Sequence, residues 1–144
     1  MALKIKHIQK LASGENLTTE FGVGDAVRVF QRISDTDKKD EIKERTQVFE
    51  GTVIAVRGKG LGQTFTVRRI GAQKIGIEQI YPVQSPVVTK IEVVRQGMYG
   101  VRRAKLYYIR GKSKKEVEKI YSRSNRILRA KKAYKEKTAK KKAK

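Results

Sequence analysis

Residues Gln47–Ile70, with the sequence QVFEGTVIAVRGKGLGQTFTVRRI, decide the fold that this chain is expected to adopt. Two runs rich in β-branched and aromatic residues, Thr46–Arg57 and Gln63–Ile70, flank the glycine-dense connection Gly58–Gly62. A short connection of that composition is typical of a β-hairpin. The stretch therefore predicts a hairpin that supplies much of the hydrophobic core. Gly51, inside the first run, indicates a bend, a bulge or a close approach of another backbone.

The second run of the hairpin alternates between apolar and polar residues. Phe65 and Val67 share one face of the expected strand, while Thr64, Thr66 and Arg68 share the other. We therefore expect one face to pack in the core and the other to hold arginine side chains outward.

Three further strands are expected around the hairpin, at Ala26–Ile33, Lys74–Tyr81 and Val87–Arg95. In the first of them, Arg28, Phe30 and Arg32 lie on the outward face, where Phe30 suits either stacking on a base or packing on a neighbouring loop. Five short strands with turn signals every dozen or so residues predict a mainly β fold, a small antiparallel barrel or sandwich.

The segments beside these strands carry weaker signals. Leu3, His7, Ile8 and Leu11 recur at helical spacing and predict a short N-terminal helix, in which His7 is a packed or surface residue. Ser34–Glu44 is polar and nearly balanced in charge, which predicts a solvated loop. Its acidic residues lack the spacing and the glycine of a calcium-binding EF-hand loop.

The charge of the chain is large and uneven. Lys and Arg number 35 against 14 Asp and Glu, for a formal net charge of +21. Residues 1–100 hold sixteen basic and eleven acidic residues, whereas residues 101–144 hold nineteen basic and three acidic ones. Such a density of like charge repels itself in isolation, so a polyanionic partner is expected. Nucleic acid is the leading candidate, and an anionic membrane surface is the alternative.

The basic third of the chain has two parts. Val101–Arg110 interleaves basic residues with aromatic ones, a combination that suits RNA because guanidinium groups bind phosphates and phenol rings stack on unpaired bases. Tyr107 and Tyr108 equally suit anchoring this segment to the sheet. Ser113–Glu116 has the form of a capping box, and apolar residues continue behind it at helical spacing as far as Leu128. A solvated, disordered end of the chain is the alternative for the last ten residues in isolation.

Several classes of protein fit poorly. The chain has no cysteine, which excludes disulfides, thiolate metal sites and a cysteine nucleophile, and it has one histidine. Gly58–Gly62 lacks the Lys-Ser/Thr pair of a phosphate-binding P-loop. The absence of tryptophan argues against a peptide-binding module with an aromatic groove. No run is apolar enough for a transmembrane helix or a leader. We expect a soluble, intracellular, non-enzymatic protein without cofactor or metal.

Seven runs of the sequence also carry a resemblance when taken in order. They are FGVGDAVRV (Phe21–Val29), RTQVFEGTVIA (Arg45–Ala55), TFTVR (Thr64–Arg68), GIEQIYP (Gly76–Pro82), SP (Ser85–Pro86), KIEVVR (Lys90–Arg95) and VRRAKLYYIR (Val101–Arg110). Together they are similar to the bacterial large-subunit ribosomal protein L19 family over roughly residues 3–112. Gln79 in place of the family's usual arginine, the small insertion Met98–Gly100 and a longer tail beyond Lys112 are departures.

The resemblance implies an SH3-like barrel with a short N-terminal helix, seated on large-subunit rRNA where that subunit meets the small one. It further implies contacts with neighbouring ribosomal proteins and with small-subunit rRNA, a part in bridging the subunits, and a cytoplasmic location in the ribosome. A nucleic-acid-binding transcription or translation factor of the KOW type, outside the ribosome, is the alternative.

Four segments are expected: an N-terminal helix and linker over 1–20, a barrel over 21–97, a basic aromatic segment over 98–112 and a basic helical extension over 113–144. The residues expected to bind RNA are the outward arginines of the strands, the hairpin lysine and the basic and aromatic residues that follow residue 100. They are Arg28, Arg32, Arg57, Lys59, Arg68, Arg69, Arg102, Arg103, Lys105, Tyr107, Tyr108, Arg110, Lys112, Lys114, Lys115, Arg123, Arg126 and Arg129.

Overall fold

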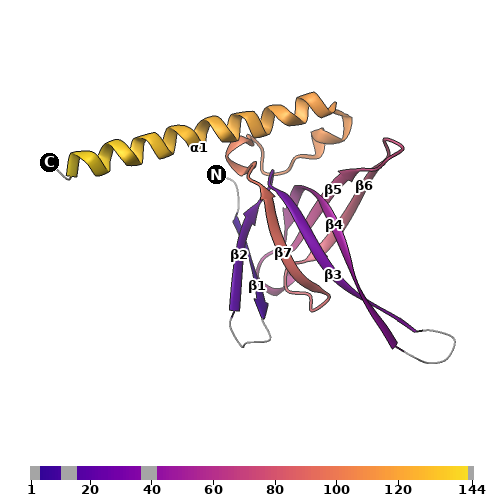
Figure 1. Ribbon diagram of the computed structural model, residues 1–144. Helices are drawn as coiled ribbons and strands as arrows, with labels where there is room; N and C mark the ends of the chain where they lie inside the picture. The colour runs from indigo at the N-terminus through magenta and orange to yellow at the C-terminus, as the bar shows by residue number, and fades with distance from the viewer. Residues whose placement is uncertain (1–3, 11–15, 37–41, 143–144) are drawn as a thin grey trace.

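The computed structural model describes residues 4–10, 16–36 and 42–142. Within those residues the chain forms a five-stranded antiparallel sheet, a separate two-stranded hairpin and one long C-terminal helix (Figure 1). The strands are β1 (Lys4–Lys10), β2 (Asn16–Gly22), β3 (Ala26–Thr36), β4 (Ile42–Arg57), β5 (Thr64–Ile70), β6 (Gly76–Pro82) and β7 (Val88–Arg95). The helix is α1 (Lys114–Lys142), and short 3₁₀ turns lie at Gly60–Gly62, Met98–Gly100 and Tyr107–Gly111.

The five strands predicted from the sequence all exist and form one sheet. Its order is β6-β5-β4-β3-β7, and every neighbouring pair is antiparallel. The central hairpin is β4 and β5, in register from Thr52 opposite Arg68 to Arg57 opposite Thr64, with a register shift between Val53 and Ala55. The hairpin prediction is therefore confirmed.

The main core lies on one face of this sheet. Phe65 and Val67 of β5 are fully buried, as their alternation predicted. The Phe65 ring packs edge-on against Phe21 with a centroid distance of 5.0 Å, and it stacks on Tyr81 at 5.5 Å. Such aromatic contacts add to the stabilisation that comes from buried area alone.

A second apolar cluster covers the other face near the C-terminal end of β4. It joins Ile54 and Ala55 of the strand to Leu106, Ile109 and Ile120 from the C-terminal third of the chain. The outward face predicted for the hairpin is therefore only partly open, and Thr66 on that face is buried. Residues that follow β7 return over the sheet and remove this area from water.

The predicted N-terminal helix is wrong for the residues that the structure describes there, because Lys4–Lys10 is strand β1. Ile5 and His7 are buried and Ile8 is 60% exposed, which is the alternation of a strand. Strand β1 pairs with β2, which places Ile5 opposite Phe21 and joins both to the main core. Leu3 and Leu11, the outer positions of the predicted helix, lie outside the described residues.

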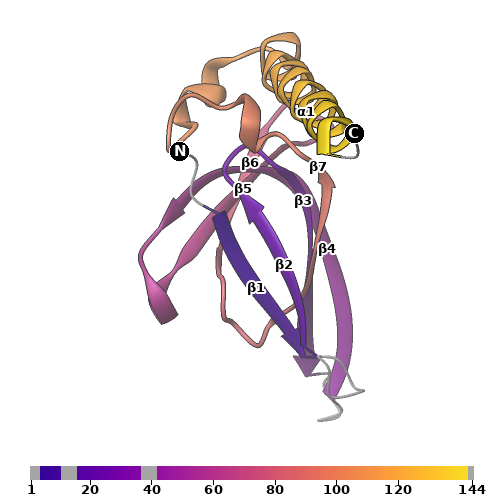
Figure 2. The same ribbon diagram turned by 90° about the vertical axis from the view of Figure 1, so that its left-hand side faces the viewer.

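A closed barrel is not found among the described strands. The hydrogen-bonded ladder ends at β6 on one side and at β7 on the other, and β1 pairs with β2 alone. The hairpin of β1 and β2 crosses the open side of the curved sheet (Figure 2), and its buried side chains fill the core there. The predicted barrel is thus an open sheet covered by a hairpin.

The segment predicted as the solvated loop 34–44 is largely strand. Thr36 of β3 pairs with Ile42 of β4 at the far end of a long hairpin that projects from the body (Figure 1). Arg45 and Asp35 form a cross-strand ion pair at 3.0 Å. Opposite charges on facing strands favour pairing, so the polar composition here supports a ladder rather than a loop. Residues 37–41 lie outside the described residues.

Helix α1 begins where the capping box predicted. The Glu116 carboxylate accepts a hydrogen bond from the backbone N–H of Ser113 at 3.0 Å, which satisfies one of the free donors of the first turn. This bond and, above all, the ammonium of Lys112 hold the pKa of Glu116 below its ordinary value. The helix packs against the body at Gly100, where an added Cβ would lie 1.9 Å from the carbonyl oxygen of Ile120.

Candidate nucleic-acid interface

The basic segment 98–112 is tied to the sheet by its apolar residues. The backbone N–H of Leu106 donates to the carbonyl of Ile54 at 2.7 Å, and the Leu106 side chain is fully buried. The neighbouring cations Arg102, Arg103 and Lys105 are exposed, and no ion pair to a described acidic residue involves them. The segment therefore presents free positive charge on a rigid support, which suits contact with phosphates.

The two tyrosines of this segment differ. Tyr107 is partly buried against the second cluster, and its hydroxyl oxygen accepts hydrogen bonds from Arg57 at 2.8 and 3.1 Å. Tyr108 is 37% exposed, and the guanidinium of Arg103 lies 5.4 Å from its ring centroid. Of the two roles that the sequence leaves open for these tyrosines, Tyr107 therefore has the anchoring one. Tyr108 remains available to stack on a base.

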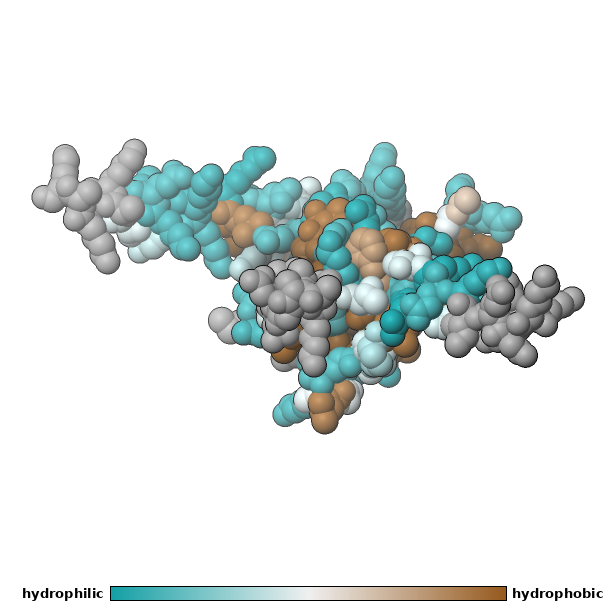
Figure 3. All heavy atoms as spheres, turned by 60° about the horizontal axis from the view of Figure 1, so that its bottom comes forward, coloured by the Kyte–Doolittle hydropathy of each residue, from teal (hydrophilic) through white to brown (hydrophobic). Residues whose placement is uncertain are grey.

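Helix α1 carries five of the predicted RNA-binding residues. Four of these are exposed, and Arg123 is half-buried with its Nε donating to the carbonyl of Lys119 at 3.2 Å. Hydrophilic side chains cover the far half of the helix in Figure 3. The five residues are Lys114, Lys115, Arg123, Arg126 and Arg129.

Two arginines of strand β3 are paired with carboxylates on neighbouring strands. Arg28 lies between Glu50, at 2.8 Å, and Glu92, at 3.6 Å. Arg32 lies 3.7 Å from Glu44. Each of these side chains is about half exposed, but its charge is partly balanced within the protein, so it offers less to an incoming phosphate than an unpaired cation does.

Arg68 and Arg110 share one carboxylate. Glu78 accepts from Arg68 at 2.8 Å and from Arg110 at 2.6 and 2.8 Å, and the Arg68 side chain is only 15% exposed. The hydrogen bonds from Arg110 first, and those from Arg68 second, hold the pKa of Glu78 below its ordinary value despite its burial. This triad fastens segment 98–112 to strands β5 and β6, so its arginines have a structural task.

This triad predicts a stability loss in acid. A carboxylate whose pKa is lowered in the folded state stabilises the fold above its unfolded pKa of about 4.3, and the contribution disappears as the pH falls through the folded-state pKa. The melting temperature of the wild-type chain should therefore decrease as the pH drops below about 4. Glu78→Gln should make the melting temperature depend less on pH in that range. Glu50→Gln, which removes an exposed carboxylate, is the control. Identical slopes in all three proteins, measured by thermal denaturation from pH 5 to 3, would contradict a stabilising triad.

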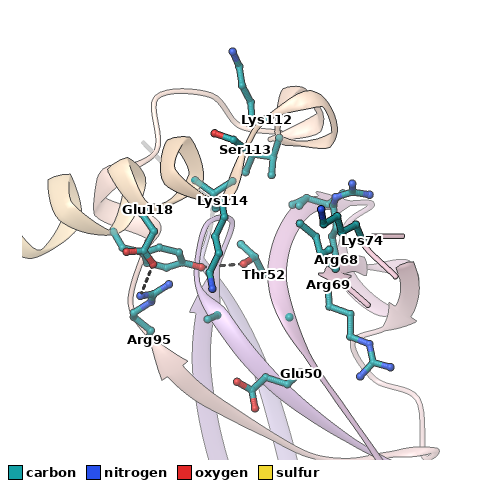
Figure 4. Close-up of a pocket in the computed structure, with 17 residues that line it drawn as sticks. Glu50, Thr52, Arg68, Arg69, Lys74, Arg95, Lys112, Ser113, Lys114 and Glu118 are labelled. Atoms are coloured by element: carbon teal, nitrogen blue, oxygen red, sulfur yellow. Dashed lines mark hydrogen bonds and ion pairs between the residues drawn. The ribbon is translucent and has the colours of Figure 1, made fainter. Parts of the chain in front are cut away.

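An open cleft of about 930 Å³ lies between the start of α1 and the outer face of β4 and β5 (Figure 4). It gathers four of the predicted residues, although they are distant in sequence: Arg68, Arg69, Lys112 and Lys114. Lys74 and Arg95 also line it and were missed. The sequence predicts that Lys74 begins a strand, whereas in the structure Gly71 and Lys74 form the tight turn between β5 and β6. The turn-forming residues before Ile75 are the sequence signal that could have predicted this turn.

The remaining predicted residues lie apart from this cleft. Lys59 is exposed in the turn of the central hairpin, and Arg57 packs beside Tyr107. Among the described residues no group of three or more His, Cys, Asp or Glu is placed to hold a metal ion. No helix within the described ranges is long and apolar enough to cross a membrane.

Comparison with known proteins matches residues 4–123 to the family described as Ribosomal protein L19. The chain is 58% identical over 91 residues to large ribosomal subunit protein bL19 of Thermosipho melanesiensis, an overlap of 63% of this chain and 73% of that relative. The protein of the same name from Thermosipho africanus is 57% identical over the same length and shares. That from Clostridium botulinum is 50% identical over 104 residues, or 70% of this chain and 84% of the relative.

Proposed function

Because the chain belongs to the ribosomal protein L19 family, whose members are structural, non-enzymatic components of the large ribosomal subunit, we propose that it binds large-subunit rRNA near the interface with the small subunit. There it supports bridging between the subunits and contacts neighbouring ribosomal proteins. Family membership places the chain in the cytoplasmic ribosome.

One observation carries the RNA-binding part of the proposal: the cations of the C-terminal third are largely unpaired, whereas those of the sheet are largely paired. Residues 101–144 contain nineteen basic and three acidic residues. Glu116 and Glu118 each hold one cation, Lys112 and Arg95. Exposed and unpaired cations on a rigid support are the electrostatic footprint of a nucleic-acid-binding surface.

The shape of the molecule supports contacts at more than one place. Helix α1 has 29 residues and is therefore roughly 44 Å long at 1.5 Å per residue. Its buried residues, Ile120, Tyr121 and Ser124, all lie in the first half, and the second half extends away from the body (Figure 1). A body bound to one RNA surface would leave that second half able to reach another.

Sedimentation tests the proposal against a KOW-type factor outside the ribosome. A tagged chain in its source cells should migrate with large subunits and with whole ribosomes on a sucrose gradient at moderate salt. A chain found only at the top of the gradient would contradict the proposed function. The KOW-type alternative has no separate observation in its favour, because the family matched is one of ribosomal proteins.

Deletion of residues 131–144 separates the helix end from the folded body. We expect this truncation to weaken rRNA binding and to reduce its salt dependence, because it removes eight lysines and one glutamate. The melting of the body should barely change, since residues 132–137 are all exposed. Binding assays and thermal denaturation of the truncated and full chains measure both effects. Unchanged binding and unchanged incorporation into ribosomes would leave the segment with a role in solubility alone.

A further inference from the structure

The cleft between α1 and the sheet has a size and an interior that the fold itself does not require. Its volume of about 930 Å³ lies at the upper end of the range for small-ligand sites, roughly 300–1,000 Å³. The apolar surface that it offers to solvent comes from Ile70 of β5 and Val117 of α1, because the side chains of Ile54, Ile109 and Tyr121, which also line it, are buried. An apolar, open interior of this kind accepts a flat, largely apolar group such as a nucleobase.

The rim of the cleft is cationic. Six basic residues line it, against Glu50 and Glu118. They are Arg68, Arg69, Lys74, Arg95, Lys112 and Lys114.

Ion pairs account for only half of these cations. Arg68 is held by Glu78, Arg95 by Glu118 at 3.2 Å and Lys112 by Glu116 at 3.0 Å. The Glu50 carboxylate, for its part, is bound by Arg28 at 2.8 Å.

Of the other three, the Arg69 guanidinium lies 4.9 Å from the centroid of the Phe49 ring, and Lys74 and Lys114 remain without an ion pair among the described residues. Lys74 and Lys114 come from two different elements: the turn before β6 and the first turn of α1. In Figure 4 the Lys114 side chain extends from the helix start into the space above the sheet, while Lys112 points out of it. Lys74 has a φ of 61°, the one positive φ of a non-glycine residue among those described, and it lines the cleft from the turn before β6. Two cations without an ion pair, from distant parts of the chain, thus line a cleft that exposes Ile70 and Val117.

The strands that line the cleft argue against a peptide as its ligand. Strands β4 and β5 are interior strands of the sheet, each paired on both sides, so they present no free edge to which an extended peptide could add. A nucleotide needs no such edge. Its base requires apolar or planar surfaces and its phosphates require cations.

We propose that this cleft holds one unpaired nucleotide of RNA, extruded from a stem, with its base against Ile70 and Val117 and its flanking phosphates on Lys74 and Lys114. The inference rests on the proposed function, rRNA binding, and names the kind of RNA feature that the surface recognises. Burial of a base on such surfaces should favour a stem with an unpaired nucleotide over a fully paired stem by about tenfold.

A pair of RNA stems tests this with the full-length chain. One stem carries a single bulged 2-aminopurine nucleotide, and the other has the same sequence with 2-aminopurine paired. The wild-type chain should bind the bulged stem about tenfold more tightly at one fixed salt concentration. The fluorescence of the bulged 2-aminopurine should change on binding, because the base moves from water into the cleft.

Lys114 and its neighbour Lys115 supply a matched pair of variants. Both are exposed and lie in the first turn of α1, but Lys114 lines the cleft and Lys115 does not. Lys114→Glu and Lys115→Glu change the net charge equally, and a glutamate is favourable at a helix start. Lys114→Glu should abolish the preference for the bulged stem and the fluorescence change. Lys115→Glu should weaken binding to both stems by the same factor and keep the preference.

The outcomes separate this inference from the proposed function. Equal binding of the two stems by the wild-type chain, or equal effects of the two variants, would overturn the cleft as a nucleotide site while leaving RNA binding in place. Failure to bind either stem, together with failure to sediment with ribosomes, would contradict the proposed function itself. If Lys114→Glu leaves stem binding intact and disrupts only association with other ribosomal proteins, the occupant is a protein segment and the nucleotide inference is wrong.

Discussion

Raising the salt concentration from 50 to 200 mM should weaken the binding of the purified chain to large-subunit rRNA fragments by about 10³- to 10⁵-fold. That range corresponds to roughly 6–10 phosphate contacts, each of which releases condensed counterions, with duplex DNA as the guide. Ten of the predicted RNA-binding cations are exposed and have no ion pair with a described acidic residue, which agrees with that number. They are Arg57, Lys59, Arg69, Arg102, Arg103, Lys105, Lys114, Lys115, Arg126 and Arg129.

Paired and unpaired arginines should contribute differently to this salt dependence. Replacing Arg102, Arg103 and Lys105 together by glutamine should lower the slope of log affinity against log salt by about 2–3, because each lost phosphate contact removes nearly one counterion. Arg28→Gln should change the slope less, because Glu50 and Glu92 already balance that charge. Filter binding across a salt series measures both slopes. A flat response of the wild-type chain would exclude an electrostatic interface.

Gly51→Val should destabilise the fold more than any lysine-to-alanine change in the C-terminal segment. A Cβ at Gly51 would lie 2.5 Å from the carbonyl oxygen of Arg68 and 2.9 Å from the Cγ1 of Val67. Both neighbours belong to strand β5 and one contact is backbone, so the central hairpin would have to separate. Overpacking of this kind costs about 3 kcal/mol or more. The melting temperature should accordingly fall by about 10 °C.

Gly62→Val is the matched control for this substitution. Gly62 lies in the turn of the same hairpin, and an added Cβ there meets nothing within 4 Å. Thermal denaturation of both variants and of Lys137→Ala should show a large loss for Gly51→Val alone. If the two valine variants have the same melting temperature, the close approach at Gly51 does not affect the stability of the fold.

Much of the β-sheet was predictable because its signals are local. The hairpin of β4 and β5 follows from strand-forming runs around a short glycine-rich turn, and Phe65 and Val67 are buried as their alternation indicates. The start of α1 follows from the capping box at Ser113 and Glu116. The concentration of unpaired cations after residue 100 follows from composition alone. In each case the deciding interaction lies within a few residues along the chain.

The errors arose where the deciding partner is distant in sequence. Leu3, His7, Ile8 and Leu11 fit a helix by spacing, but Ile5 gains more by pairing opposite Phe21 and entering the main core. The expected closure of the sheet failed in the same way, because the β1–β2 hairpin covers its open side and its burial does not depend on a closed ladder.

The predicted site shows the same division between local and distant signals. Sequence identified the basic residues, but only the tertiary structure separates Arg68 and Arg110, which are bound to Glu78, from Arg102 and Arg103, which have no ion pair with a described acidic residue. The cleft has no signature in sequence, since strand β5, the turn at Lys74 and the start of α1 meet only in the folded chain. The sequence by itself therefore determined which elements form and how much positive charge the chain carries. Which cations are left unpaired, and around what cavity, depends on contacts between residues 32 and 42 positions apart, namely Glu78 with Arg110 and Arg68 with Arg110.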